Sequence, residues 1–584
     1  MCERNVITAT NISKSFYDKA SKKEIVALEN INITIPHGKL TALIGPDGAG
    51  KTTFLRMVCG LLVTSSGSLD VLGIDVTVNP QEVQDRISYM PQKFGLYEDL
   101  SVSENMNLYA DLHGVPLEER KERFARLLEM TGLAKFTERL AGKLSGGMKQ
   151  KLGLACTLVR SPELLLLDEP TVGVDPLSRR ELWEILQQLV ADEGLTVLVS
   201  TAYMDEAELC SKVIVVNDGK VLIEDTPENL RQLARGKCYK LAPPKGIPSR
   251  ILQAVLLDDV ENVIDAVPEG GEVRFIARAQ ESVGNLQAYK YFNGLVPRAV
   301  DERLEDSVMI VLREKIGNPD NTGFEIDFSK KLTLSETIDI EVKDLVRKFG
   351  DFIAVNNTSF QVRQGEIFGL LGPNGAGKTT TFKMLCGLLP ASSGYLSVAG
   401  VDLRTARTQA RANIGYVAQK FSLYSTLTVD ENMEFYGGAY GLSDKRLAER
   451  MTEVKNQFGL TEMSDNEAGE LPGGYKQRLS MAAALLHEPR IIFLDEPTSG
   501  IDPLARRTFW QQITALAAEG KTIIITTHFM EEAEYCDRIM IQDQGKMLAI
   551  GTPSEIRAQG GVEATDMNEA FIAIVENSRE NKEV

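Results

Sequence analysis

The sequence GPDGAGKTTFLRMVCGLL occupies residues 45–62 and directly follows the apolar run KLTALI at residues 39–44. The apolar run predicts a buried strand, and the spacing of the apolar residues after the glycines predicts a helix. The pattern GxxxxGK[ST] between a strand and a helix is typical of a phosphate-binding loop, because glycines let successive backbone N–H groups turn toward one anion. Lys51 is then expected to reach the β- and γ-phosphates of a nucleotide, and Thr52 to offer its hydroxyl to Mg²⁺.

The chain contains this segment twice. GPNGAGKTTTFKMLCGLL begins at Gly372, 327 positions after Gly45, and the same offset aligns YMPQKFGLYEDLSVSENMNLY at residues 89–109 with YVAQKFSLYSTLTVDENMEFY at residues 416–436. The offset falls to 326 by Thr201 and Thr527, so the second copy lacks one residue. A register kept over so many positions indicates an internal duplication. We therefore predict two copies of one domain, residues 1–235 and 336–560.

Each copy is expected to be an α/β domain. The apolar runs in ELLLLDEP at residues 163–170 and LTVLVST at residues 195–201 predict buried strands, and their alternation with helical stretches indicates a mostly parallel sheet covered by helices. Residues 118–128 have the pattern of an amphipathic helix and predict a helical subdomain between the phosphate loop and the LLLLDEP strand. The predicted fold class is α/β, with two phosphate-loop ATPase domains joined by a small α+β unit.

The segment between the copies repeats nothing. Residues 236–315 predict a small α+β unit, with strands at 238–241, 263–267 and 272–277 and helices at 249–257 and 282–292. Residues 316–335 are polar and contain Pro319 and Gly323, so they predict a linker. Residues 561–584 predict a C-terminal helical tail. Two interpretations of the middle unit stay open: a spacer between the copies, and a module for regulation or partner binding.

Each copy also carries two acids at the end of an apolar strand, Asp168 with Glu169 and Asp495 with Glu496. The first acid of each pair is expected to hold Mg²⁺, and the second to polarise the attacking water. Gln92 and Gln419 suit a polar group that touches the metal and senses the γ-phosphate. The predicted metal ligands are Thr52, Gln92, Asp168, Thr379, Gln419 and Asp495, and the predicted cofactors are ATP and Mg²⁺. The two loops are predicted to hold the nucleotide through Gly45, Pro46, Asp47, Gly48, Ala49, Gly50, Lys51, Thr52 and Thr53, and through Gly372, Pro373, Asn374, Gly375, Ala376, Gly377, Lys378, Thr379 and Thr380.

A further motif identifies a family resemblance. LSGGMKQ at residues 144–150, followed by LLLLDEP and by GVDP at residues 173–176, resembles the motif order of ATP-binding cassette ATPases. YMPQKFGLYEDL, GVDPLSRRELW and LDEPTSGIDPLARR resemble more narrowly the fused, tandem ATPase subunits of bacterial drug and antibiotic exporters. The resemblance covers both copies. It implies a head-to-tail dimer within one chain, with each ATP held between one phosphate loop and the signature motif of the other copy.

The resemblance also implies roles for particular residues. Ser145, Gly146 and Gly147 in one signature and Gly473 and Gly474 in the other are expected to contact ATP, and Phe16 and Phe349 to stack on adenine. His528 occupies the position of the family's switch histidine, which together with Glu169 and Glu496 gives the expected catalytic residues.

The partners follow from the same resemblance. It implies two integral-membrane permease subunits, a periplasmic adaptor protein and a peripheral location on the cytoplasmic face of the inner membrane. The repeated KF-x-LY segments at residues 93–97 and 420–424 suit a groove for a permease helix, and packing into the core is the alternative interpretation.

The two copies differ at two functional positions. Copy one reads STAYMDEAE where copy two reads TTHFMEEAE, so Ala202 replaces the histidine. Copy two reads LPGGYKQ where copy one reads LSGGMKQ, so Pro472 replaces Ser145 and removes both a hydroxyl and a backbone N–H. In a head-to-tail dimer both changes belong to one site. The sequence therefore predicts one intact site and one weakened site, and the weakened site keeps Glu169.

Composition narrows the alternatives. Lys and Arg number 64 against 82 Asp and Glu, a net charge of −18, and residues 236–315 carry 11 basic against 12 acidic residues. Nucleic acid is therefore not an expected partner, which disfavours a soluble tandem ATPase acting on ribosomes or DNA. The tandem ATPase of a sugar importer shares the duplication and is the other alternative. The seven cysteines form no CxxC pair, which argues against a Cys-rich metal site. No apolar stretch predicts a membrane span or a secretory signal.

Overall fold

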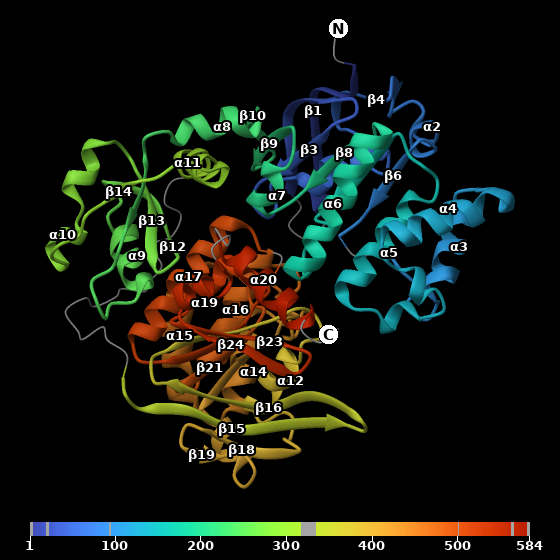
Figure 1. Ribbon diagram of the computed structural model, residues 1–584. Helices are drawn as coiled ribbons and strands as arrows, with labels where there is room; N and C mark the ends of the chain where they lie inside the picture. Colours follow the sequence, from blue (N-terminus) through green and yellow to red (C-terminus); the bar gives the residue numbers. More distant parts are fainter. Residues whose placement is uncertain are drawn as a thin grey trace. The chain divides into compact units, whose positions relative to one another are not determined.

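The computed structural model describes residues 4–18, 23–92, 95–316, 335–499, 501–561 and 566–580 (Figure 1). The chain divides into two compact units, one made of residues 1–233 with 303–312 and the other of residues 234–302 with 313–584. Below, residues 4–233 are called the first cassette, residues 234–302 the middle unit and residues 335–580 the second cassette. The middle unit thus belongs to the same compact unit as the second cassette.

The first cassette is built on a six-stranded sheet in the order β10-β9-β3-β8-β7-β6. Neighbouring strands pair in parallel, except that β10 is antiparallel to β9. Strands β3, β7 and β8 are buried along their whole length, as their unbroken apolar sequences predict. The strands are β3 (Leu40–Ile44), β6 (Ile87–Met90), β7 (Leu164–Asp168), β8 (Thr196–Ser200), β9 (Lys212–Asn217) and β10 (Lys220–Asp225).

A second, antiparallel sheet of the first cassette has the order β2-β1-β4-β5. Its strands are β1 (Asn5–Asp18), β2 (Lys23–Pro36), β4 (Ser66–Val71) and β5 (Ile74–Asp75). The helices are α1 (Lys51–Val58), α2 (Pro80–Gln84), α3 (Val102–Leu112), α4 (Leu117–Met130), α5 (Gly146–Leu158), α6 (Pro176–Glu193), α7 (Met204–Glu208) and α8 (Pro227–Arg231). Helix α5 packs against α3 and α4, and these three form the predicted helical subdomain. Ser101 and Glu104 fix the start of α3 through a capping box.

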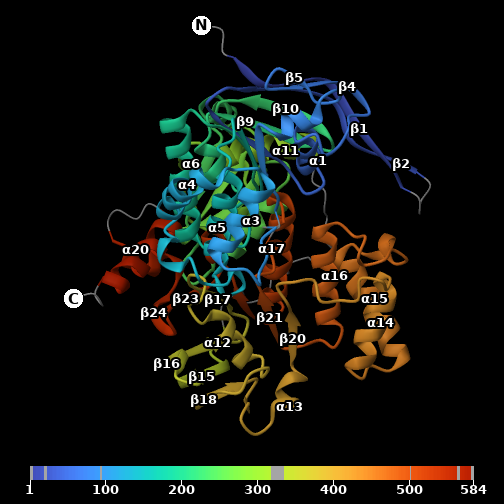
Figure 2. The same cartoon turned by 90° about the vertical axis from the view of Figure 1, so that its right-hand side faces the viewer.

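The second cassette repeats this architecture. Its six-stranded sheet, β20-β21-β22-β17-β23-β24, has the strand order of the first sheet, and β16-β15-β18-β19 repeats the antiparallel sheet. Figure 2 shows its helical subdomain of α14, α15 and α16. The strands are β15 (Ile338–Phe349), β16 (Phe352–Arg363), β17 (Ile367–Leu371), β18 (Ser393–Val398), β19 (Val401–Asp402), β20 (Ile414–Val417), β21 (Ile491–Asp495), β22 (Thr522–Thr526), β23 (Arg538–Asp543) and β24 (Lys546–Gly551). The helices are α12 (Lys378–Leu385), α13 (Arg407–Arg411), α14 (Val429–Ala439), α15 (Asp444–Phe458), α16 (Gly473–Leu485), α17 (Pro503–Ala518), α18 (Met530–Ala533), α19 (Pro553–Gln559) and α20 (Met567–Glu580). The predicted α/β fold in two repeats is confirmed.

The middle unit has a four-stranded sheet in the order β12-β13-β11-β14, with α9 packed on β12 and β13. Its elements are β11 (Cys238–Leu241), α9 (Ser249–Asp258), β12 (Val263–Glu269), β13 (Glu272–Ala277), α10 (Ala288–Tyr291) and β14 (Arg298–Ala299). The predicted helix at 282–292 is wrong: a 3₁₀ turn at Glu281–Asn285 and the short α10 take its place. Gly284 and Asn285 lie where the two pieces separate, and both residue types disfavour a helix interior.

Helix α11 (Leu304–Ile316) follows the middle unit and was not expected from the sequence. Most of the predicted linker, residues 317–334, lies outside the described residues. The same holds for residues 562–565 and 581–584 of the predicted tail, and its described part forms α20. The six described cysteines are free and buried. Among the described residues, no helix is both long and apolar enough to cross a membrane.

Candidate functional site

The first phosphate loop joins β3 to α1 and can be built only with glycine at two positions. A Cβ on Gly45 would lie 2.0 Å from the carbonyl oxygen of Val216. Gly50 has a φ of 98°, and a Cβ there would lie 2.5 Å from the Leu28 side chain and 2.7 Å from the Ala27 carbonyl oxygen. The loop is therefore pressed closely against neighbouring backbone, which leaves its other side, with the start of α1, to face a ligand.

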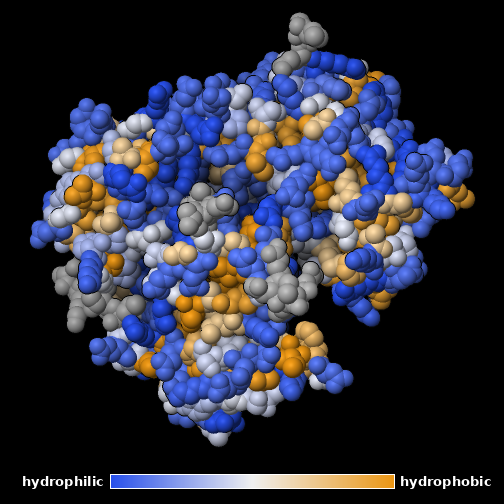
Figure 3. All heavy atoms as spheres, viewed as in Figure 1, coloured by the Kyte–Doolittle hydropathy of each residue, from blue (hydrophilic) through white to orange (hydrophobic). Residues whose placement is uncertain are grey.

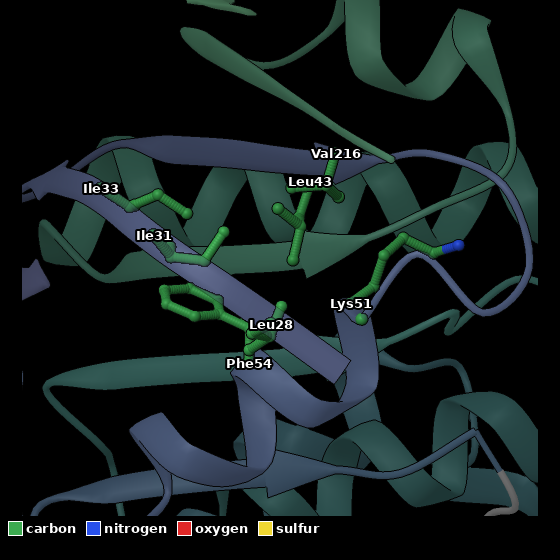
Figure 4. Close-up of a pocket in the computed structure, with 8 residues that line it drawn as sticks. Leu28, Ile31, Ile33, Leu43, Lys51, Phe54 and Val216 are labelled. Carbon is green, nitrogen blue, oxygen red and sulfur yellow. The ribbon is translucent and has the colours of Figure 1, made fainter. Parts of the chain in front are cut away.

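Apolar side chains pack next to this loop. Figure 4 shows Leu28, Ile31, Leu43 and Phe54 pointing into one space between strand and helix, while the amine of Lys51 points away from it. Lys51 Nζ donates to the carbonyl oxygens of Gly45 at 2.7 Å and Pro46 at 3.0 Å. The cation is thus held at the mouth of the loop, where it can move onto a phosphate without crossing the core.

The two acids of the first cassette lie next to the loop. Thr52 Oγ1 donates to Asp168 Oδ1 at 3.1 Å, and Ser200 Oγ donates to the same oxygen at 2.7 Å. Glu169 Oε1 is 3.8 Å from Lys51 Nζ, and Glu169 Oε2 accepts a hydrogen bond from Gln92 Nε2 at 2.6 Å. The structure therefore brings together the predicted hydroxyl, both acids, the lysine and the glutamine.

The second cassette repeats the arrangement. Lys378 Nζ donates to the carbonyl oxygens of Gly372 at 2.5 Å and Pro373 at 3.0 Å. Thr526 Oγ1 donates to Asp495 Oδ1 at 2.6 Å, and Gln419 Nε2 donates to Glu496 Oε2 at 2.5 Å. A Cβ on Gly377, where φ is 102°, would lie 2.3 Å from the Ala354 carbonyl oxygen.

The remaining loop residues lie where the motif predicts. Thr53 and Thr380 lie in the first turns of α1 and α12, and Thr379 is exposed at the start of α12. The other residues span the turn between strand and helix in each cassette: Pro46, Asp47, Gly48 and Ala49 in the first, and Asn374, Gly375 and Ala376 in the second.

Both water-polarising candidates have unusual backbone. Glu169 has a φ of 49° and Glu496 a φ of 46°, in the left-handed region that favours glycine. Each N–H donates to the residue that ends the neighbouring parallel strand, Ser200 Oγ at 2.9 Å and Thr526 Oγ1 at 3.0 Å. This bond, made one residue after the strand ends, holds the backbone in that conformation and fixes the glutamate beside the loop.

His528 lies against Glu496. Its Nδ1 is 3.2 Å from Glu496 Oε2, its side chain is buried, and its ring stacks on Phe529 with centroids 4.8 Å apart. Among the described residues, both ring nitrogens of His528 are buried without a hydrogen bond, so Nδ1 meets Glu496 as a close contact and Nε2 is open to a further partner. The ring can therefore contact the glutamate and a phosphate oxygen at the same time.

The electrostatic environment of the second pair of acids is set by these neighbours. Burial acts to raise the pKa of Glu496, but the nearby imidazole of His528, the charge of Lys378 and the hydrogen bond from Gln419 outweigh it and lower that pKa below its ordinary value. Burial raises the pKa of Asp495. Glu496 is therefore ionised at neutral pH, which is the form that accepts a proton.

The first cassette has no counterpart to this histidine. Ala202 is buried at the equivalent position between Thr201 and Tyr203. The surrounding frame is the same in both cassettes: Thr201 Oγ1 donates to Glu206 at 2.5 Å, and Thr527 Oγ1 donates to Glu532 at 2.7 Å. At this position the two cassettes therefore differ by the imidazole itself.

The two signature motifs begin helices whose N-termini are capped differently. Ser145 is the N-cap of α5, and its hydroxyl accepts a hydrogen bond from Met148 N at 3.3 Å, with Gly146 and Gly147 in the first turn. Pro472 is the N-cap of α16 and makes no side-chain cap, with Gly473 and Gly474 following. Proline therefore removes a helix cap as well as a polar group that could face a phosphate.

Phe16 and Phe349 lie on the antiparallel sheets, and neither belongs to the core. Their side chains are 39% and 47% exposed, respectively. Each faces a cation, Lys14 Nζ at 5.1 Å from the Phe16 ring centroid and Arg347 Cζ at 4.4 Å from the Phe349 centroid. Both rings are accessible for stacking on a planar base.

Four polar residues of the site were not predicted. Ser200 and Thr526 end the strands that pair with β7 and β21, directly opposite Asp168 and Asp495 in register. A parallel pairing of the two apolar strands that ends in Asp and in Ser or Thr would have been the signal. Glu206 and Glu532 anchor the segments around Ala202 and His528, and burial raises the pKa of Glu206 to about 7.

The residues fit a magnesium ion bound together with nucleotide phosphates. In the described part of the chain, no cluster of three or more His, Cys, Asp or Glu side chains forms a closed metal site. Thr52 and Asp168 already lie in contact, and a cation would offset the burial of Asp495. Mg²⁺ commonly takes one or two protein oxygens and completes its shell with phosphate and water.

Known proteins are similar to this chain in both cassettes. The ABC transporter family matches residues 28–172 and 355–499, once in each cassette. YbhF, a probable multidrug ABC transporter ATP-binding protein of Escherichia coli (strain K12), is 47% identical over 578 residues, which cover 98% of each chain. The linearmycin resistance ATP-binding protein LnrL of Bacillus subtilis (strain 168) is 40% identical over 243 residues, which cover 40% of this chain and 78% of that protein. A solved ATP-binding subunit of an ABC transporter is 31% identical, with a TM-score of 0.38 over 41% of this chain and 99% of its own. This chain therefore belongs to the ABC transporter family and is an ATPase with two ATP-binding cassettes in one polypeptide.

Proposed function

We propose that this chain hydrolyses ATP to drive separate membrane permease subunits that export drug-like or antibiotic molecules. Two observations support the proposal: the relative that spans nearly the whole chain is named as a probable multidrug transporter component, and a relative of one cassette is named for linearmycin resistance. In this proposal the chain lies on the cytoplasmic face of the inner membrane and works with two permeases and a periplasmic adaptor.

The two ATP sites are proposed to be unequal. In a head-to-tail pairing of the cassettes, one site combines the loop of the second cassette, Glu496 and His528 with the Ser145 signature. The other combines the loop of the first cassette, Glu169 and Ala202 with the Pro472 signature. The observation that carries the proposal is the contact of His528 with Glu496, which Ala202 cannot make.

The intact site has a residue for each requirement of hydrolysis. Lys378 neutralises the γ-phosphate, and the loop N–H groups orient it. Glu496 takes a proton from the attacking water, and His528 holds the carboxylate next to the phosphate. When bound by Thr379, Asp495 and Gln419, Mg²⁺ supplies positive charge to the phosphate oxygens.

The helical subdomains are the proposed permease surface. Tyr97 is 55% exposed in the first cassette, and Tyr424 and Phe435 are 48% and 49% exposed in the second, where their rings pack edge to face. Figure 3 shows further apolar residues at the outer tip of α3 and α4, where Leu112 and Leu117 are exposed. Phe421 is half-buried against the core, so the aromatic surface is carried by Tyr424 rather than by Phe421. Phe94 lies outside the described residues.

The inequality is tested with the same substitution at the two equivalent glutamates. Glu496→Gln should lower steady-state phosphate release at saturating Mg-ATP about 100-fold, since losing one preorganised group costs about 3 kcal/mol. Glu169→Gln, the matched control, should lower it less than about 3-fold, with binding of a fluorescent ATP analogue retained in both variants. Equal losses would contradict unequal sites.

The permease is tested by co-purification from membranes. The tagged chain should bring down integral-membrane proteins encoded beside it, and Tyr424→Asp with Phe435→Asp should release them while soluble ATP binding persists. A variant that binds ATP and still retains its membrane partners would place the permease surface elsewhere. Stimulation of ATPase activity by candidate drugs in the reconstituted complex would then identify the cargo class.

A further inference from the structure

The middle unit is fastened to the second cassette by a buried ion pair. Arg250 of α9 donates to Asp537 through Nε at 3.1 Å and Nη2 at 3.0 Å, and both side chains are 4% exposed. Asp537 Oδ2 also accepts the N–H of Ile367 at 2.9 Å. Ile367 begins β17, the strand that runs directly into the phosphate loop at Gly372. The arginine of the middle unit therefore holds the base of that strand.

A second buried pair joins the middle unit to α17. Arg507 Nε is 3.2 Å from Asp265 Oδ2 of β12, with both side chains almost fully buried. Arg507 Nη1 also donates to the hydroxyl of Tyr535 at 3.3 Å, and the Tyr535 ring stacks on Trp510 with centroids 4.5 Å apart. The edge strand of the middle unit is thus tied to a helix of the second cassette and to the segment after α18.

Two further side-chain contacts connect helix α17 to the histidine of the site. Arg506, the neighbour of Arg507 on α17, lies over the ring of Phe529 at 4.3 Å from its centroid. Phe529 stacks on His528, which touches Glu496. Two residues that contact the middle unit, Tyr535 through Gln253 Nε2 at 3.5 Å and Asp537 through Arg250, follow His528 within nine residues of chain.

The first cassette shows that this anchoring is not needed for the fold of the cassette. Leu209 and Ser211 stand at the positions of Tyr535 and Asp537, and both are exposed. Arg180, at the position of Arg507, is 45% exposed and pairs with Glu184 of its own helix. The arginine over the aromatic ring is kept, with Arg179 at 4.5 Å from Tyr203. At these positions, the buried contacts with the middle unit belong to the cassette that carries the histidine.

We propose that the middle unit is a positioning element for the intact ATP site, rather than a spacer. Through Arg250 and Asp265 it fixes α17 and residues 527–537, and thereby holds His528 against Glu496. Arg250 and Asp265 are positioning residues, since they act through the histidine and do not touch the nucleotide. The inference rests on the proposed function, in which the site with Glu496 carries most of the turnover.

The test compares two arginines of the middle unit in the full-length chain. Arg250→Met should lower kcat about 5-fold and leave the affinity for Mg-ATP within about 2-fold, because coupling through packed side chains is commonly of this size. Arg250→Lys should recover at least half of the lost kcat. The matched control is Arg298→Met, which removes an exposed pair with Glu272 inside the middle unit and should leave kcat unchanged.

Other outcomes would overturn the inference. A folded Arg250→Met protein with full kcat, or one whose kcat falls only in step with ATP affinity, would show that the pair is merely structural. Should Arg250→Met fail to fold, Asp265→Asn keeps the shape of the side chain and should lower kcat about 3-fold; an unchanged kcat would overturn the proposal. Glu496→Gln measured in parallel separates the two ideas: if that variant keeps full turnover, it is the proposed function that fails.

Discussion

Transfer of the missing groups to the weakened site is a direct test of how the two sites differ. In the proposed function, the turnover that remains in a Glu496→Gln background comes from the site with Glu169. Ala202→His with Pro472→Ser then supplies the imidazole and the hydroxyl that this site lacks. The surroundings of Ala202 can accept an imidazole ring. Arg179 Cζ lies 4.5 Å from the centroid of the Tyr203 ring, and Arg506 Cζ lies 4.3 Å from the centroid of the Phe529 ring, so the two segments pack alike.

The expected magnitude follows from the two groups that Ala202 and Pro472 do not provide. One preorganised donor is worth about 3 kcal/mol, or about 100-fold in rate. His528 is held by Phe529 on one side and Glu496 on the other, and Tyr203 and Glu169 stand at the corresponding positions around Ala202. Groups that act as one unit are not additive. We therefore expect Ala202→His alone to raise residual phosphate release about 10-fold, and the two substitutions together to raise it about 100-fold.

The assay is single-turnover phosphate release at saturating Mg-ATP, with nucleotide binding measured on the same preparations. Ala202→Leu, which fills the position without a polar group, is the control and should give no increase. A gain below about 2-fold in a protein that binds ATP at both sites would refute the reasoning. The histidine and the serine would then not be what separates the two cassettes.

Three further substitutions test separate parts of the structure. Pro472→Ser should stabilise the second cassette by about 1 kcal/mol in denaturant unfolding by restoring the N-cap of α16, and Pro472→Ala should gain much less. Burial raises the pKa of Glu534 to about 7, so its protonation stabilises the fold below the ordinary pKa of 4.5, and this stability is lost as pH rises toward 7. The unfolding free energy of Glu534→Gln should therefore rise relative to that of the parent by about 1 kcal/mol per pH unit between pH 5 and 7, and the difference should level off above pH 8. A difference that stays constant with pH would show that Glu534 titrates normally. Gly377→Ala places a Cβ 2.3 Å from the Ala354 carbonyl oxygen, so the loop should no longer hold a phosphate. The number of fluorescent nucleotides bound per chain should fall from two to one. Retention of two would show that the loop can shift.

Much of the architecture follows from local sequence. The phosphate loops, the strands that end in Asp168 and Asp495, and the order of elements in each cassette depend on residues close together in the chain. The duplication supplies an internal check, because each motif occurs twice at one offset. The α/β fold could be predicted for these reasons.

Other features depend on contacts that spacing does not encode. Arg250 and Asp537 are separated by 287 positions, so nothing in either segment points to the other. Residues 282–292 carry apolar residues at helical spacing, but Gly284 and Asn285 interrupt the helix and Val283 and Leu286 are buried in the middle unit instead. The partners of the site acids, Ser200 and Thr526, become evident only once the parallel register of the strands is known.

At Glu169 and Glu496 the left-handed backbone places the stability of the fold in opposition to the ATPase activity of the site. A side chain in that conformation costs about 1 kcal/mol, which glycine would avoid. Glycine at Glu496 would relieve this backbone cost but would also remove the hydrogen bond from Gln419 and the contact with His528, so ATP hydrolysis would fall. The proposed proton acceptor of the intact site thus carries a backbone cost of about 1 kcal/mol at the position where its carboxylate meets the phosphate loop.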